Sequence, residues 1–491
     1  MATAAETARE YRQYVGGQWA PAANGDTFAD EDPFTGEVVA TVPAGGAEDA
    51  RLAIEAAAAA FPSWSATPPA ERQRVFLKAA DVLESRRDEV VSLLARETGC
   101  TFGFGMFQMS FVPGLFRQAA AAPYAPIGEV IPSDNPGTFA MGVRRPVGVV
   151  GAIAPWNAAL ILSARSIAAP LALGNTVVLK PSEWSPVVGG LLWGEVFAEA
   201  GLPDGVLNVV PHAPGAAGEI ADELVTHPAV RRINFTGSTA VGRKLAEAAG
   251  RNLKRIVLEL GGYNPVIVLA DADLEYAVNA TAFGAFLHQG QICMSARRVF
   301  VERSVADEFT EKLAAKAKSL KAGDPKEPDT IIGPLINAQA LATVKGRVDE
   351  AVRQGARVLA GGEAVGPCYQ ATVVADIPVD SDLARMETFG PVLAVEAVDG
   401  PEQAVERANA TSYGLAAGIL TSDADRGFAL AQQLESGIVH VNDQPVGDEP
   451  QMPFGGVKDS GFGRFGGQAA IDEFTELRWI TIQAGTHPFP F

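Results

Sequence analysis

Cys293 and Glu259 are the side chains of this sequence best suited to covalent chemistry. Cys293 lies in Gly290-Gln-Ile-Cys-Met-Ser, on an expected loop where a ligand can approach a reactive thiolate. A buried structural cysteine is an equally good interpretation of this segment alone. Glu259 ends an apolar run in Leu-Glu-Leu-Gly-Gly, where burial would raise the pKa of the carboxyl and suit it to general-base work. The alternative is a strand-end glutamate that faces water.

Asn157 and Lys180 each follow an apolar run, in Ala-Pro-Trp-Asn and in Val-Val-Leu-Lys. In open α/β sheets, ligands bind beyond the carboxyl ends of the strands. The Asn157 amide could therefore donate to a developing oxyanion, or it could cap the helix that begins at Ala158. Lys180 could contact ribose hydroxyls or an adenosine phosphate, or it could be a surface lysine.

The segment from Phe235 to Gly242 has the pattern of a strand, a glycine turn and a helix start. Ser238 and Thr239 can cap this helix, and its free N–H groups suit a pyrophosphate. The segment lacks the full G-x-G-x-x-G pattern, so alone it is only a weak indication of a dinucleotide site. The loops Glu387–Pro391 and Pro453–Lys458 would each pass as an ordinary turn.

Short apolar runs that alternate with helical stretches must position these residues. Runs that are buried on both faces and separated by helices indicate βαβ units and a parallel sheet. We expect strands at 147–154, 176–180, 206–210, 232–235 and 256–260, and helices at 47–60, 70–97, 162–172, 185–200, 215–226 and 239–249.

A second α/β alternation begins at Asp273, which can cap a helix that ends at Gly290. A strand at 298–301 then leaves Cys293 on the connecting loop. The tail, Leu477–Gln483, would be an exposed edge alone, so we expect it to pair with another sheet, of this or of another subunit. Further strand–helix pairs are expected through 305–321, 337–354, 391–409 and 415–434, with a last buried strand at 437–442.

Composition narrows the possible classes of protein. A chain of 491 residues is long enough for two or three domains. Its net charge of −19 disfavours nucleic acid and anionic membranes as partners. The three cysteines and five histidines show no zinc-binding spacing, so no metal site is expected. The polar stretch 1–14 is not a secretory signal, and no apolar run reaches membrane length, so we expect a cytoplasmic protein.

Taken together, these segments resemble the aldehyde dehydrogenase superfamily over nearly the whole chain. The 34-residue step from Glu259 to Cys293 also matches that family. The resemblance implies an α/β fold with a Rossmann-like NAD(P)-binding domain at 1–123 and 144–258, an α/β catalytic domain at 259–471 and a β oligomerisation arm at 124–143 and 472–491. A homodimer or homotetramer is implied as well. The motifs, in the family's order, are PWN at 155–157, LKPSE at 179–183, FTGS at 235–238, ELGG at 259–262, GQIC at 290–293, ETFGP at 387–391 and PFGG at 453–456.

The resemblance also implies catalytic roles. Cys293 attacks the aldehyde carbon, and the Asn157 amide and the Cys293 N–H hold the oxyanion of the thiohemiacetal. After hydride transfer leaves a thioester, Glu259 activates water to release the carboxylic acid. Tyr263 stands where many relatives have lysine, a difference that leaves this scheme intact but could alter local packing or cofactor fit.

For the cofactor, the resemblance places Glu387 on the nicotinamide ribose and Lys180 and Glu183 near the adenine ribose. The Glu183 carboxylate would accept from ribose hydroxyls and repel a 2′-phosphate, so NAD is favoured, although Lys180 leaves NADP possible. The other implied contacts are Ser238 at the pyrophosphate, with Ile153 and Trp156 lining the cofactor cleft.

The substrate is predicted from finer similarities. The GQICMS and PWNAALIL-x-x-R stretches resemble benzaldehyde, vanillin and salicylaldehyde dehydrogenases, which implies an aromatic aldehyde. Phe104, Phe107 and Phe111 have helical spacing, which indicates a core face, or, with Met109, the wall of an apolar tunnel. Arg165 could meet a ring hydroxyl or carboxylate, or form a surface salt bridge.

Two other functions fit the same motifs. In a coenzyme A-acylating dehydrogenase, coenzyme A rather than water takes the thioester, and Glu259 argues against that route because it has no need of a water-activating base. An inactive binding protein with the same fold would not need Cys293, Glu259 and Asn157 together.

Overall fold

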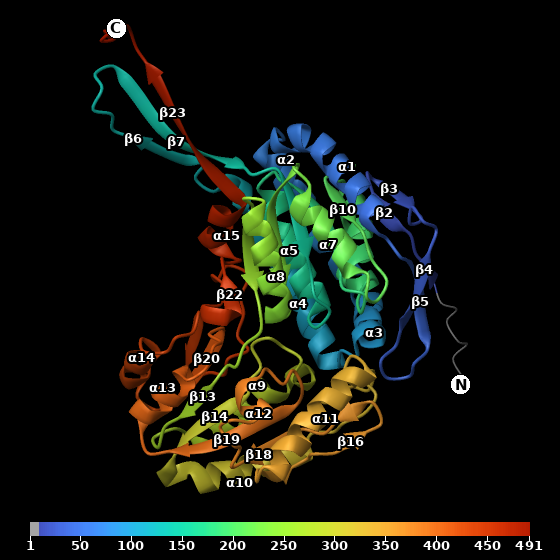
Figure 1. Cartoon of the computed structure of the whole chain (residues 1–491), viewed down its shortest axis with the longest axis vertical. Helices are drawn as coiled ribbons and strands as arrows, with labels where there is room; N and C mark the ends of the chain where they lie inside the picture. Colours follow the sequence, from blue (N-terminus) through green and yellow to red (C-terminus); the bar gives the residue numbers. More distant parts are fainter. Residues whose placement is uncertain (1–8) are drawn as a thin grey trace.

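The computed structural model describes residues 9–491 as two α/β bodies with a narrow β extension (Figure 1). Residues 1–8, which belong to the predicted NAD(P)-binding domain and to the polar stretch 1–14, lie outside the described residues. Within residues 9–491, no helix combines the length and the apolar character needed to cross a membrane.

An eight-stranded sheet, ordered β22-β12-β11-β8-β9-β10-β2-β3, forms the first body. Its five central strands are parallel, and they confirm the five strands expected from the apolar runs, with ends shifted by a few residues. Antiparallel strands from distant parts of the chain complete both edges. The strands are β8 (Val149–Ile153), β9 (Thr176–Lys180), β10 (Leu207–Val209), β11 (Val230–Thr236), β12 (Arg255–Glu259), β2 (Gln13–Val15), β3 (Gln18–Ala20) and β22 (Gly461–Phe462).

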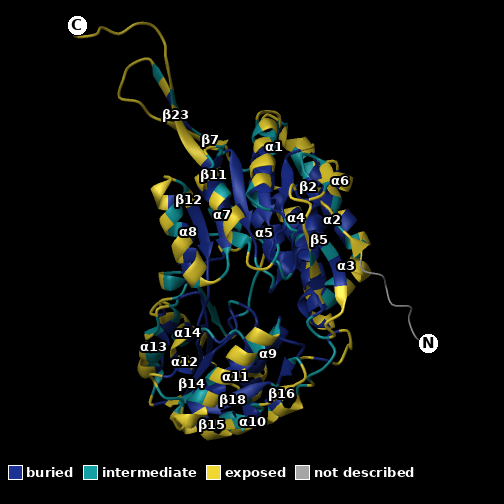
Figure 2. Ribbon diagram, turned by 45° about the vertical axis from the view of Figure 1, so that its right-hand side comes forward, coloured by how far each residue is buried: buried dark blue, intermediate teal, exposed yellow. Residues whose placement is uncertain are grey.

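Helices cover both faces of this sheet, so its strands are buried on both sides (Figure 2). The helix predicted at 70–97 is wrong as a single element, because Arg86 leaves helical geometry and separates two helices. The stretch predicted at 185–200 begins with a π-helical turn at Val187–Leu191. The helices are α1 (Ala47–Ser65), α2 (Pro69–Ser85), α3 (Arg87–Thr98), α4 (Phe102–Ala119), α5 (Ala159–Ala172), α6 (Leu192–Ala200), α7 (Ala217–Thr226) and α8 (Thr239–Arg251).

A seven-stranded sheet, ordered β15-β18-β19-β14-β13-β20-β21, forms the second body. Asp273 caps α9, as predicted. The last strand, predicted to be buried, is only partly buried because it lies at the edge of the sheet. The strands are β13 (Val266–Val268), β14 (Arg298–Glu302), β15 (Arg357–Ala360), β18 (Thr372–Ala375), β19 (Val392–Val398), β20 (Ala416–Leu420) and β21 (Ile438–Val441). The helices are α9 (Leu274–Phe286), α10 (Arg303–Ser319), α11 (Ala338–Arg353), α12 (Asp382–Arg385), α13 (Pro401–Asn409) and α14 (Ala424–Ala431).

The extension is a three-stranded antiparallel sheet of β6 (Gly128–Ile131), β7 (Thr138–Pro146) and β23 (Thr475–Gln483). The tail therefore pairs with β7 of its own chain over the full length of both strands. The remaining elements are β1 (Arg9–Glu10), β4 (Thr27–Glu31), β5 (Val38–Pro43), β16 (Ala364–Val365), β17 (Cys368–Tyr369), α15 (Gly467–Phe474) and the short 3₁₀ turns Ala122–Tyr124, Leu287–Gly290 and Lys458–Ser460.

Candidate active site

The carboxyl ends of four parallel strands lie side by side at the edge of the first sheet. The strand register pairs Ile153 with Lys180 and with Phe235, and Thr236 with Glu259. Glu259 therefore lies at one end of this row and Lys180 at the other. Loops that leave this edge are the expected place for a ligand in an open parallel sheet.

A cavity of about 290 Å³ lies between this edge and the second body. Six of the nine predicted site residues line it, and they come from both bodies. The other three, Ile153, Lys180 and Glu183, lie outside its lining, at or just after the ends of β8 and β9. The lining residues are Pro155, Trp156, Asn157, Thr236, Gly237, Ser238, Glu259, Leu260, Gly261, Cys293, Glu387 and Phe389.

Cys293 is held on a tightly constrained loop. His288 and Gln289 both have positive φ, at 50° and 54°, a conformation that L side chains rarely adopt. Gln289 donates through Nε2 to the carbonyls of Gly99 and Pro334, at 3.0 Å each. On the far side, Asn264 donates through Nδ2 to the Cys293 carbonyl at 2.7 Å. These contacts fix the backbone that carries the Cys293 side chain.

Burial raises the pKa of the Cys293 thiol to about 12, and the negative charges of Glu387 and Glu259 contribute in the same direction. The thiol is therefore protonated near neutral pH and needs a base to become a nucleophile. The remaining exposed part of this half-buried side chain borders the cavity. Its place on the cavity wall favours a functional interpretation over a buried structural cysteine.

Glu259 is buried, at 3% exposure, so the alternative of a strand-end glutamate facing water is wrong. Neither carboxylate oxygen has a hydrogen-bond partner among residues 9–491. Burial raises the pKa of Glu259 well above its usual value, opposed by the positive charges of Arg464 and Arg165. A carboxyl in this state can take a proton near neutral pH.

The Asn157 side chain points toward the cysteine loop. Its Nδ2 donates to the carbonyl of Gln291 at 2.9 Å, two residues before Cys293. It makes no capping hydrogen bond to the following helix, so the helix-cap alternative is wrong. An amide carries two N–H groups, and the second remains available to an oxygen in the cavity.

Glu387 and Trp156 approach the same cavity from opposite bodies. Glu387 accepts from the Gly262 N–H at 3.3 Å, and burial raises its pKa to about 6, opposed by the charge of Arg297. A Cβ on Gly261 would lie 2.4 Å from the Glu387 carboxylate, so a side chain at this position would displace that carboxylate. The Trp156 ring packs edge-on against Phe389, with centroids 5.6 Å apart.

Ser238 has the capping role expected of it. It is the N-cap of α8, and its Oγ accepts from the Val241 N–H at 3.4 Å. Because it also lines the cavity, it presents the amino end of α8 to that space. Such a helix end attracts anionic groups.

Lys180 is buried at 5% exposure, so the surface-lysine alternative is wrong. Its Nζ lies 2.6 Å from Nε2 of His212, which follows β10. The Glu183 carboxylate lies 3.7 Å from the same ring nitrogen. Burial lowers the pKa of Lys180 to about 8, opposed by Glu183. His212 was missed in the sequence, although it follows a strand end at the same edge as Lys180.

Arg165 forms a buried ion pair with Asp448, so the predicted surface salt bridge is wrong in its location. Its guanidinium lies 4.4 Å from the ring centroid of Phe454 and 5.7 Å from that of Phe111. Its charge lowers the pKa of both Glu259 and Cys293, while Asp448 raises both, so the pair lies close to them. Asp448 lies on a loop with no periodic pattern, and no feature of the sequence indicated it.

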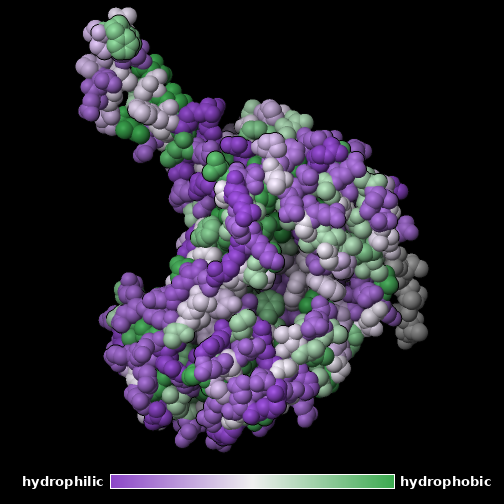
Figure 3. Space-filling model, in the orientation of Figure 1, coloured by the Kyte–Doolittle hydropathy of each residue, from purple (hydrophilic) through white to green (hydrophobic). Residues whose placement is uncertain are grey.

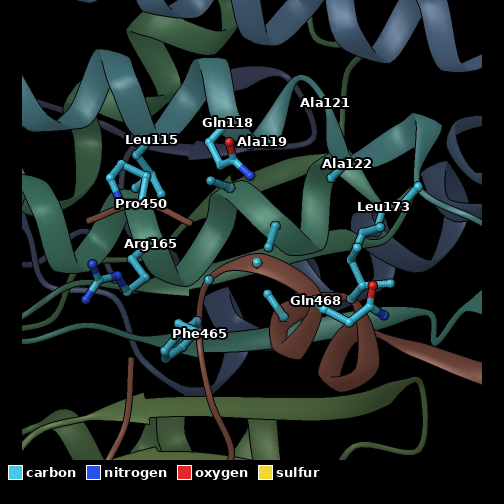
Figure 4. A pocket seen from close by; sticks show the side chains of 17 residues that line it. Leu115, Gln118, Ala119, Ala121, Ala122, Arg165, Leu173, Pro450, Phe465 and Gln468 are labelled. Carbon is cyan, nitrogen blue, oxygen red and sulfur yellow. The ribbon is translucent and has the colours of Figure 1, made fainter. Parts of the chain in front are cut away.

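The α4 helix packs a largely buried face near the Arg165–Asp448 pair. Phe104, Met109 and Phe111 are buried, but Phe107 is 46% exposed. A second cavity of about 230 Å³ lies between α4, α5 and α15, and Arg165 lies on its wall with Leu115 and Phe465 (Figure 4). Arg165 therefore contacts Asp448 on one side and borders this second cavity on another.

Comparison with known proteins places the chain in a family. The sequence model of the aldehyde dehydrogenase family matches residues 19–480, and the chain belongs to this family. It is an oxidoreductase that acts with a nicotinamide cofactor.

Among its relatives, vanillin dehydrogenase of Pseudomonas fluorescens is 50% identical, over 97% of this chain and 98% of the relative. Benzaldehyde dehydrogenase [NAD(+)] of Pseudomonas putida is 44% identical, over 94% of each chain. The fold matches the crystal structure of a salicylaldehyde dehydrogenase from Pseudomonas putida G7 complexed with salicylaldehyde, with a TM-score of 0.96, 41% identity and coverage of 99% of this chain and 100% of that one. The predicted fold class is thus confirmed.

Proposed function

We propose that this cavity oxidises aromatic aldehydes to carboxylic acids, with Cys293 as the nucleophile and Glu259 as the base. The observation that carries this proposal is the convergence of Cys293, Glu259 and Asn157 on one cavity of about 290 Å³. A thiol and a carboxyl that share a poorly solvated space are the groups that a cysteine nucleophile and its deacylating base require.

The residues present fit a dinucleotide along the strand edge. Lys180, His212 and Glu183 supply donors and acceptors for an adenosine ribose at one end. Ser238 and the amino end of α8 suit the pyrophosphate at the middle, and Glu387 and Trp156 suit the nicotinamide riboside at the other end. A nicotinamide held there would supply the acceptor for a hydride from the substrate carbon.

The chain's own residues account for the remaining steps. The Cys293 thiol loses its proton to solvent through the cavity, and its sulfur then bonds to the aldehyde carbon. The second N–H of the Asn157 amide donates to the oxygen that becomes negative. Once the thioester has formed, Glu259 takes a proton from water, which attacks the carbonyl carbon and releases the acid and the thiol. Glu387 and Trp156 keep the cavity narrow around the reacting carbon.

The coenzyme A-acylating alternative has a direct test. NADH formation is measured with and without coenzyme A over a panel of aliphatic and aromatic aldehydes. We expect turnover without coenzyme A and the highest kcat/KM with aromatic aldehydes. Strict dependence on coenzyme A would reject the hydrolytic route, and absence of any NADH burst would favour the inactive binding protein.

The pair of Asp448 and Arg165 favours an aromatic aldehyde whose ring carries a hydroxyl group as the substrate. Arg165 Nη1 and Asp448 Oδ1 are both buried without a hydrogen-bond partner among the described residues. Because Asp448 compensates the charge of Arg165, the pair suits a neutral hydroxyl, which can donate to Oδ1 and accept from Nη1, better than a carboxylate.

We expect Asp448→Asn to lower kcat/KM for hydroxybenzaldehydes by about tenfold more than kcat/KM for benzaldehyde, because the amide is a weaker acceptor than the carboxylate. Glu449→Gln, a matched change at the exposed neighbouring residue, should leave the ratio of the two values unchanged. Equal losses with both aldehydes in Asp448→Asn would show that Asp448 has no part in recognising the ring.

The Glu183 carboxylate favours NAD over NADP as the cofactor. The carboxylate accepts from Ser182 Oγ at 3.1 Å and keeps further acceptor capacity for ribose hydroxyls. We expect Glu183→Gln to raise KM for NAD severalfold and to lower KM for NADP about tenfold, since repulsion of the 2′-phosphate is removed. Steady-state kinetics with both cofactors checks this, and a variant whose preference for NAD is unchanged would contradict it.

We propose that the extension is an oligomerisation arm of a homodimer or homotetramer. Exposed apolar side chains lie on all three of its strands, and Figure 3 shows hydrophobic groups along it. Apolar surface of this kind is commonly covered in an assembly. The exposed apolar side chains of the extension are Val130, Ile131, Phe139, Leu477, Trp479 and Ile482. All three cysteines are free, which fits a reducing compartment such as the cytoplasm.

A further inference from the structure

His212 is a buried side chain whose hydrogen-bonding state is determined by its two neighbours. Its Nδ1 lies 2.9 Å from the carbonyl oxygen of Ala213, which can only accept. Its Nε2 lies 2.6 Å from Nζ of Lys180, and an ammonium can only donate. Nδ1 therefore carries the proton of a neutral imidazole, and Nε2 accepts from Lys180.

The electrostatics of the cluster agree with this arrangement. Burial and the positive charge of Lys180 lower the pKa of His212 to about 4, against the opposing effects of the Ala213 and Pro181 carbonyls and of Glu183, so the ring is neutral near pH 7. Glu183, 3.7 Å from Nε2, is the nearby negative charge that favours a charged Lys180. A protonated His212 would instead place two positive charges 2.6 Å apart in a buried site.

The donors of Lys180 can be counted. An ammonium has three N–H groups. One is directed to His212 Nε2 at 2.6 Å and one to the Pro181 carbonyl at 3.3 Å. The third has no acceptor among the described residues, and its direction follows from the other two, so it can donate to a ligand. Without His212, the flexible lysine side chain would lose its shorter contact and the fixed direction of this donor.

We propose that His212 is a cofactor-positioning residue, which holds the Lys180 ammonium in the orientation that binds the hydroxyls of the adenosine ribose. The role rests on the proposed binding of the cofactor along the strand edge, with its adenosine end at Lys180 and Glu183. His212 acts only through Lys180 and has no part in the steps at Cys293, so it should affect the affinity for the cofactor and not the chemical steps.

The test uses the full-length enzyme and the probe ADP-ribose, which contains the adenosine end of the cofactor without nicotinamide. The variants are His212→Leu, which has no acceptor, and His212→Gln, whose side-chain oxygen can still accept from Lys180. Lys180→Met and the double variant complete a cycle. His227→Gln is the matched control. His227 precedes β11 and so lies at the amino ends of the parallel strands, away from the carboxyl ends where Lys180 lies. The dissociation constant of ADP-ribose and the kcat and KM for NAD are measured for each.

We expect His212→Leu to raise the dissociation constant of ADP-ribose and KM for NAD by about tenfold, with kcat within about twofold of the wild type. His212→Gln should restore most of the affinity, and His227→Gln should have no effect. In the Lys180→Met background, His212→Leu should cause no further loss, because the donor that it positions is gone.

The binding results distinguish an error in the placement of the adenosine from an error in the role of His212. Unchanged ADP-ribose affinity in Lys180→Met would overturn the placement of the adenosine and the role of His212 with it. A loss in Lys180→Met without one in His212→Leu, or losses that simply add in the double variant, would overturn the role of His212 alone. Should His212→Leu not fold, a crystal structure of the wild type with ADP-ribose decides. Lys180 bridging His212 and a ribose hydroxyl supports the role, and Lys180 turned away from His212 overturns it.

Discussion

Cys293→Ala is expected to reduce steady-state NADH formation by roughly 10⁴-fold or more with every aldehyde, because no other group can form the covalent bond to the substrate carbon. The change removes only a sulfur from a half-buried side chain, and the loop remains fixed by Gln289 and Asn264. Folding and ADP-ribose affinity should therefore be unchanged, which separates loss of the nucleophile from loss of the structure.

Cys368→Ala is the matched control for this experiment. Cys368 is also a free cysteine, and burial raises its pKa to about 11, but it lies on β17 and does not line the cavity. Its replacement should leave kcat within about twofold of the wild type. Turnover by Cys293→Ala within a factor of ten of the wild type would contradict the assigned role.

Glu259→Gln should separate the two halves of the reaction. The amide has the shape of the carboxylate but cannot take a proton from water, and general-base catalysis contributes roughly 10²–10⁴-fold. Because the charge of Glu259 raises the pKa of Cys293, its removal favours the thiolate, and attack on the aldehyde is spared. We expect about one NADH per subunit in a rapid burst, followed by turnover reduced by roughly 10²–10⁴-fold.

Stopped-flow fluorescence of NADH measures the burst, and mass spectrometry of the quenched protein should show the acyl group on Cys293. The pH profile adds an independent check. The base form of Glu259 is the active one, and burial raises its pKa, so the wild-type kcat should rise with pH through a value well above 4.5 and Glu259→Gln should lose this limb. Steady-state turnover of Glu259→Gln equal to that of the wild type would contradict the role.

Local patterns predicted the parts of the site that lie at strand ends. Glu259, Lys180 and Asn157 each follow an apolar run, and parallel strands bring such ends to one edge. The choice between a functional and a structural interpretation of each residue needed either the family resemblance or the structure, because burial depends on elements distant in the chain.

Long-range pairs were the features that the sequence could not supply. Arg165 and Asp448 are separated by 283 positions, and nothing near either residue indicates the other. A single arginine on an apolar helix is most simply satisfied at the surface, and only the packed structure shows that Arg165 is buried against a partner that is itself largely covered. His212 is less apparent in the sequence because Val210 and Pro211 separate it from the end of β10.

The edge strand β22 has a consequence for how the chain is made. Gly461–Phe462 pairs beside Glu259, on a sheet whose parallel strands are complete by residue 259, and Thr475–Gln483 pairs with β7. On the ribosome, β12 and β7 thus remain without these partners until residues 461–483 have been synthesised. Unpaired strand edges promote association between nascent chains. During synthesis, these two strand edges are therefore the places where a nascent chain of this enzyme is most open to pairing with another chain.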